Sequence, residues 1–63
     1  MANKRYTFLV KYTDLLGAPT EERTVTVLAQ NHTLAWHTAT YKALDYLPID
    51  GMIDSVTLRT ISI

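Results

Sequence analysis

Hydrophobic and polar residues alternate along two stretches in the first half of the chain. Within residues 5–13, one face carries only aromatic and aliphatic side chains, those of Tyr6, Phe8, Val10 and Tyr12. The positions between them, on the other face, are Thr7, Leu9, Lys11 and Thr13. A period of two with aromatic and β-branched residues predicts a strand. Residues 21–29 alternate in the same way and predict a second strand. The intervening residues 14–20, DLLGAPT, are rich in turn formers, so the two strands form a hairpin.

The middle of the chain changes to a helical period. Residues 34–47 predict a helix, which must end before Pro48 because a residue preceding proline disfavours the α conformation. Asn31 is the expected N-cap and Thr33 is the alternative. Residues 48–52 predict a loop, and residues 53–62, which alternate less cleanly, predict a third strand.

This order predicts one domain over residues 1–63, an α+β fold with a two-layer ββαβ architecture. A right-handed crossover places the third strand beside the first, antiparallel to it, in sheet order 2-1-3, with the helix on one face. The predicted core consists of Phe8, Val10, Val25, Val27, Ala29, Ala35, Ala39, Ala43, Leu47, Val56 and Leu58. Four aromatic residues are expected at its edges: Tyr6, Tyr12, Trp36 and Tyr46.

The predicted helix has two apolar faces. One carries Ala35, Ala39, Ala43, Tyr46 and Leu47, and three alanines allow it to lie close to the sheet. The opposite face carries Leu34, His37, Tyr41 and Leu44. Spacings of three and four are typical of a helix that packs on another helix. A domain of this size covers one face of one helix, so we expect the second face to contact another chain.

Composition narrows the function classes. The 63 residues include six Lys and Arg, six Asp and Glu, and no cysteine. A net charge of zero argues against a duplex nucleic-acid binder, which needs basic residues, and against a DNA mimic, which needs acidic ones. Without disulfides, a small domain often depends on oligomerisation, so we expect a homodimer. The chain contains no run of about 18 apolar residues, so no membrane span is predicted, and we expect a cytoplasmic protein.

No residue pattern predicts catalysis or a bound cofactor. His32 and His37 are five residues apart and do not share a helix face, whereas zinc-binding helical pairs are three or four apart. Asp50 and Asp54 flank a glycine turn, where both carboxylates are expected to be solvated. We expect a protein that is not an enzyme and that holds no metal or cofactor.

Two other surfaces are candidates for partner contact. Leu15 and Leu16 lie at the hairpin tip, where they either contact a partner or one of them folds over the sheet edge. The uncovered sheet face is expected to hold Thr7, Leu9, Lys11, Thr24, Thr26, Leu28, Thr57, Arg59 and Ile61. Its contact candidates are Leu9, Lys11, Leu28 and Arg59. Single-stranded nucleic-acid binding through this face is the alternative function. It ranks second because the face lacks the aromatic residues that stack on bases.

The layout resembles that of very small phage proteins that disarm host enzymes. The segment Tyr6-Thr7-Phe8-Leu9-Val10-Lys11-Tyr12-Thr13-Asp14, a Gly turn, a second strand, and a helix with Trp36 near its start are similar in order to the small uracil-DNA glycosylase inhibitor of Bacillus phages. Anti-CRISPR proteins are a second example of such small inhibitors. The resemblance covers most of the chain and is architectural. It implies a protein-binding inhibitor or modulator of a host or defence protein, with the position of the family's inserted aromatic near Trp36.

Overall fold

The computed structural model describes residues 3–47 and 51–62, and the predicted order of elements is confirmed. Strands β1 (Lys4–Asp14) and β2 (Pro19–Ala29) form the hairpin. Helix α1 (His32–Leu44) follows, and strand β3 (Gly51–Ser62) completes the fold. The solvated position expected for Asp50 and residues 48–50 of the predicted loop lie outside the described residues, whereas Gly51 and Met52, also expected in that loop, belong to β3.

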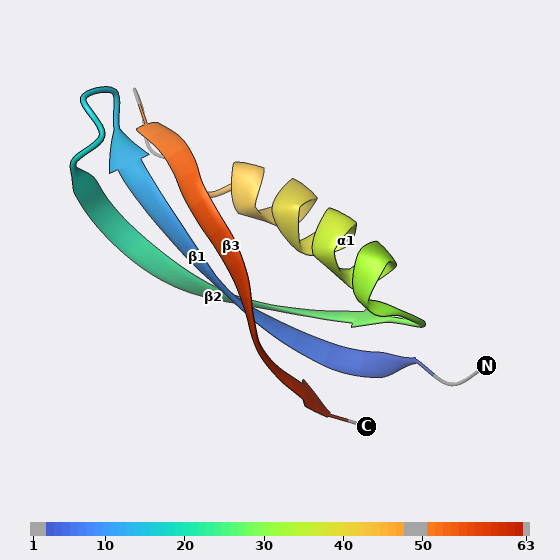
Figure 1. Ribbon diagram of the computed structural model, residues 1–63. Coiled ribbons are helices and arrows are strands. Elements are labelled where there is room, and N and C mark those ends of the chain that lie inside the picture. Colours follow the sequence, from blue (N-terminus) through green and yellow to red (C-terminus); the bar gives the residue numbers. More distant parts are fainter. Residues whose placement is uncertain (1–2, 48–50, 63) are drawn as a thin grey trace.

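The three strands form one antiparallel sheet in the predicted order β2-β1-β3. Figure 1 shows a strongly twisted sheet with α1 along one side and the hairpin tip projecting past the end of the helix. The fold is therefore the expected two-layer α+β arrangement, with one sheet face uncovered. The described residues contain no helix that is long and apolar enough to cross a membrane.

The core lies between α1 and the helix side of the sheet. The residues buried there are Tyr6, Phe8, Val10, Tyr12, Val25, Val27, Ala29, Ala35, Ala39 and Ala43. The expectation that Tyr6 and Tyr12 lie at the edge is wrong, since they are only 3% and 0% exposed. The reason is the position of β1. A central strand is flanked on both sides, so its helix-side residues are covered along the whole strand.

Helix α1 follows the predicted N-cap, begins two residues before the predicted range of 34–47, and ends three residues earlier. The Leu34 N–H donates to Asn31 Oδ1 over 2.9 Å, which confirms Asn31 as the N-cap. After Leu44 the chain tightens, because the Tyr46 and Leu47 N–H groups bond to carbonyls only three residues back, both over 3.2 Å. This tightening takes Leu47 out of the helical period. Leu47 is 38% exposed and does not belong to the core, contrary to expectation.

Strand β3 departs from simple alternation because its pairing with β1 shifts twice. The shifts fall at Asp54 and Arg59, which lie between successive residue pairs. They bring Ile53 to the helix side, where it packs on the core with Val56 and Leu58; all three are half-buried. Ile61 lies opposite Tyr6, so it belongs to the helix side and not to the uncovered face as expected. Sequence periodicity alone does not show such bulges.

Candidate functional site

The large apolar side chains of α1 point away from the sheet. Helix geometry places Leu34, His37, Tyr41 and Leu44 within about 40° of the direction opposite the three alanines. We call these four residues the helix stripe. Leu34 is 50%, Tyr41 76% and Leu44 51% exposed, and His37 is exposed as well. Ala35, Ala39 and Ala43 are 0% exposed. The three alanines are thus the only described residues of α1 that are fully buried, and the large residues of the helix stripe are presented to solvent.

The surface around the helix stripe has relief. A shallow depression is lined by two residues of the helix stripe, His37 and Tyr41, and by their neighbours Thr38 and Lys42. Trp36, expected at the core edge, is 41% exposed, and its ring meets the His37 ring edge-on at 5.4 Å between centroids. Aromatic side chains beside a shallow hollow are features that protein interfaces favour.

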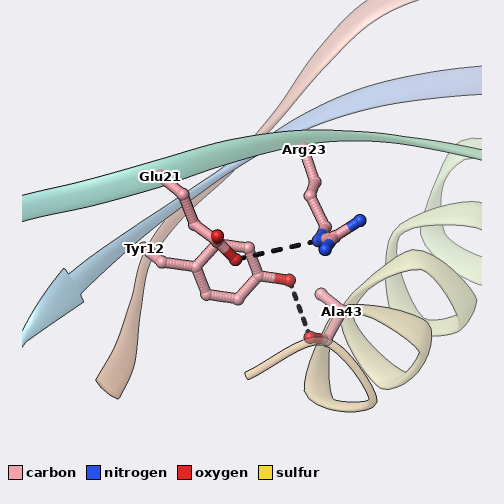
Figure 2. A network of polar contacts seen from close by, with 4 residues as sticks. All are labelled: Tyr12, Glu21, Arg23 and Ala43. Carbon is pink, nitrogen blue, oxygen red and sulfur yellow. Dashed lines mark hydrogen bonds and ion pairs between the residues drawn. The ribbon is translucent and has the colours of Figure 1, made fainter. Parts of the chain in front are cut away.

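Polar contacts fix the C-terminal end of α1 on the sheet. The Tyr12 hydroxyl donates to the Ala43 carbonyl over 2.7 Å, and Glu21 Oε1 lies 3.7 Å from Arg23 Nε (Figure 2). The same Arg23 guanidinium lies 4.4 Å from the centre of the Tyr46 ring, a cation–π contact. The Tyr12 hydrogen bond ties β1 to the last helical turn, and the Arg23 contact ties β2 to the turn that follows the helix, so the helix stripe is held in a defined orientation. Sequence reasoning did not identify the Tyr12–Ala43 and Arg23–Tyr46 contacts, because they join residues 31 and 23 positions apart.

Aromatic stacking fixes the other end of the helix. The His32 ring stacks on Tyr6 and Phe8, with centroids 6.4 and 6.2 Å apart. His32 is exposed, as predicted, and its ring also covers the end of the core.

The buried Tyr12 hydroxyl should make the free energy of unfolding fall at alkaline pH. Burial raises the pKa of Tyr12 above its ordinary value of 10.0, with the Arg23 charge acting in the opposite direction. The unfolded chain therefore loses this proton first. The Tyr12 contribution is constant below about pH 10 and decreases above it by up to about 1.4 kcal/mol per pH unit, until the pH passes the folded pKa. Urea titrations between pH 8 and 12 measure the slope.

Tyr12→Phe isolates this contribution, because every other ionisable group is present in both proteins. We expect a loss of about 1 kcal/mol at neutral pH, since the Ala43 carbonyl keeps the Tyr46 N–H as a partner. Above pH 10 the two proteins should converge in stability. Parallel pH profiles would show that Tyr12 ionises alike in the folded and unfolded chains.

The hairpin tip presents both leucines to solvent. The Asp14 carboxylate accepts the N–H groups of Leu16 and Ala18 over 2.9 Å, and Gly17 adopts a φ of 87°, which glycine allows without strain. Leu15 is 65% and Leu16 94% exposed. Neither folds over the sheet edge, so the tip remains a candidate for partner contact.

The uncovered sheet face is rich in threonine. Leu9 is half-buried, Lys11 is exposed and Leu28 is 61% exposed. Arg59 lies at a register shift, so alternation does not carry it to this face as expected. Tyr6, Phe8 and Tyr12 lie on the helix side, and none of the described aromatic residues pairs onto the open face. The face therefore offers few features for stacking on bases.

The side chains that could bind a metal are dispersed over the described residues. Among residues 3–47 and 51–62, no three His, Cys, Asp or Glu side chains lie together as metal ligands would. Asp54 is exposed at its register shift in β3.

Comparison with known proteins adds no relative. No protein-family model matches the chain, and no curated protein or solved structure matches it.

Proposed function

We propose that this chain is a non-enzymatic protein-binding module whose helix stripe docks into an apolar groove on a partner protein. One observation carries the proposal: α1 buries three alanines and exposes every larger apolar residue of its stripe. Solvent exposure of aligned large apolar side chains is unfavourable, and such patches usually mark interfaces.

The spacing of the stripe supports a groove as the partner surface. Leu34, His37, Tyr41 and Leu44 follow one another at three, four and three residues, which are the positions a helix uses when it inserts into a hydrophobic groove. A 13-residue helix is only about 20 Å long, so two convex helices of this length would cover little of each other. A concave partner wraps around the helix and covers the flanking residues Trp36 and Thr38 as well.

The biological class is the more specific part of the proposal. The small size and the ββαβ layout, which resemble phage-encoded inhibitor proteins, support a modulator of a host or defence protein that acts in the cytoplasm. Binding rather than catalysis is the activity of such inhibitors, and this agrees with a surface that is apolar and lacks converging catalytic groups among the described residues. Single-stranded nucleic-acid binding receives no such support, because the aromatic residues of β1 are buried.

A double substitution in the helix stripe tests the proposal. Tyr41→Glu with Leu44→Glu should abolish partner binding, because it places two carboxylates in an apolar groove. Both side chains are more than half exposed, so the fold should persist. Tagged wild-type protein first captures a partner from candidate host extracts. The purified partner is then titrated against each variant, with the fluorescence of Trp36, the single tryptophan, as the readout.

Leu16→Glu is the matched control, since Leu16 is an exposed leucine on another surface. It should bind the partner like wild type. The proposal is wrong if Tyr41→Glu with Leu44→Glu binds normally, and loss of binding in Leu16→Glu alone would assign the site to the hairpin tip.

A further inference from the structure

β2 is an edge strand, and the outer edge of its second half is regular in backbone geometry. Among residues 3–47 and 51–62, β2 pairs only with β1, and the β1–β2 ladder is regular from Lys4↔Ala29 to Tyr12↔Glu21. Its second half, residues 24–29, reads TVTVLA and contains no charge, glycine or proline. A regular, uncharged edge of this kind readily accepts another strand.

The hairpin shows which residues direct their main-chain groups outward. The Asp14 N–H donates to the Ala18 carbonyl, so Asp14 faces β2. Alternate residues of a strand direct their N–H and C=O groups to opposite sides. Counting back in twos, Tyr6 and Phe8 also face β2, and their partners Val27 and Val25 face β1. The residues between the valines therefore direct their main-chain groups to the open edge: Thr24, Thr26 and Leu28.

The opposite edge of the sheet is protected. β3 is interrupted by register shifts at Asp54 and Arg59, and the longest regular run between them is the four residues from Ser55 to Leu58. Bulges and charged residues are the devices by which edge strands avoid pairing with other chains. The fold therefore protects one edge and leaves the other open.

We propose that the occupant of the open edge is a second copy of this chain, paired through β2 in antiparallel orientation about a two-fold axis at Thr26. The two three-stranded sheets then form one six-stranded sheet. The copies exchange main-chain hydrogen bonds between the two Thr26 residues and between Thr24 and Leu28.

The arrangement of charges on β2 favours this register over one shifted toward Glu22, and it favours a second copy as the partner. With Thr26 opposite its counterpart, Val25 lies opposite Val27 of the second copy, and both are on the helix side. Glu21 and Glu22 then lie beyond the paired segment. A shift of the axis by one residue, to Val25, places Glu22 opposite Leu28. The TVTVLA segment is therefore complementary to itself, as a two-fold interface requires.

The dimer has a consequence for binding. A two-fold axis perpendicular to the sheet keeps both helices on the same face, and both helix stripes then point away from the sheet in the same direction. This part of the inference rests on the proposed function. Two stripes on one rigid sheet fit a partner that carries two equivalent grooves, and they increase its apparent affinity through avidity.

A single introduced cysteine tests the interface directly, because the chain has none of its own. In Thr26→Cys the two thiols lie opposite each other across the axis, where Cα atoms of a hydrogen-bonded antiparallel pair are about 5.5 Å apart, within disulfide range. Mild oxidation should convert most of the protein to a covalent dimer that melts cooperatively. Thr57→Cys, on the uncovered face of β3, and Tyr41→Cys, in the helix stripe, are the controls and should stay largely monomeric on denaturing gels.

Thr26→Pro provides the second measurement. Proline removes the outward N–H and leaves the β1 ladder intact, so the variant should fold as a monomer. Light scattering should give twice the 7.1 kDa chain mass for wild type and the single mass for Thr26→Pro. A wild-type monomer, or crosslinking through Thr57→Cys or Tyr41→Cys but not Thr26→Cys, overturns the inference. These experiments involve no partner protein, so their outcome is independent of the binding test.

Discussion

Val27→Asp is expected to unfold the protein. Val27 is 3% exposed on the helix side of β2, and all of its neighbours in the core are apolar or aromatic. None of the described core residues is charged, so a carboxylate there has no cation to pair with. An uncompensated buried charge costs about 3–5 kcal/mol, and the burial of the valine side chain is lost as well. A domain this small has roughly 3–5 kcal/mol of stability in total. Circular dichroism should therefore show no cooperative thermal transition at neutral pH.

Thr26→Asp is the matched control one residue away. Thr26 is exposed on the uncovered face, where a carboxylate stays in water, so this variant should retain a cooperative melt. It also places two carboxylates across the proposed two-fold axis and should be monomeric. Unfolding of Thr26→Asp together with a stable Val27→Asp would mean that the faces of β2 are reversed.

Phe8→Ala is the second substitution with a large expected effect. Phe8 is 0% exposed, and among the described residues only Tyr12 is a larger side chain that is as fully buried. Truncation of a buried phenylalanine costs about 3–5 kcal/mol through lost transfer energy and the cavity left behind. The stacking on His32 is lost as well. The expected result is a chain that is largely unfolded in water, measured by urea titration against wild type.

Phe8→Leu separates the effect of lost side-chain volume from the effect of losing the aromatic ring. It keeps most of the buried volume and should cost less than about 1.5 kcal/mol. If Phe8→Ala proved as stable as Phe8→Leu, α1 would be able to close onto the sheet and fill the cavity, and the alanine contact between helix and sheet would not be rigid.

The balance between core and surface explains why so few residues carry the fold. The helix contributes only methyl groups to the core, so the strands must supply nearly all the large buried side chains. This arrangement makes the sheet face of β1 and β2 sensitive to substitution. It also leaves the outer face of α1 available for the proposed partner, because the fold does not depend on its large residues.

The sequence by itself determined the elements, their order and most of their faces. Period-two alternation in β1 and β2 and the helical spacing of the three alanines are local patterns, and they identified the core valines, Phe8 and the exposed helix stripe. The Asn31 cap was equally predictable, because it depends on the geometry of four successive residues, 31–34. Sheet order followed from the short hairpin and the single crossover.

Only the tertiary structure decided the features that depend on long-range pairing. The central position of β1 buried Tyr6 and Tyr12, and the tightened turn after Leu44 exposed Leu47. The shifts at Asp54 and Arg59 moved Ile53 and Ile61, respectively, to the helix side. Each of these depends on which residues lie across the sheet or beneath the helix. Periodicity along the chain describes which side a residue takes within its own element, whereas burial and register are decided by atoms that another element supplies.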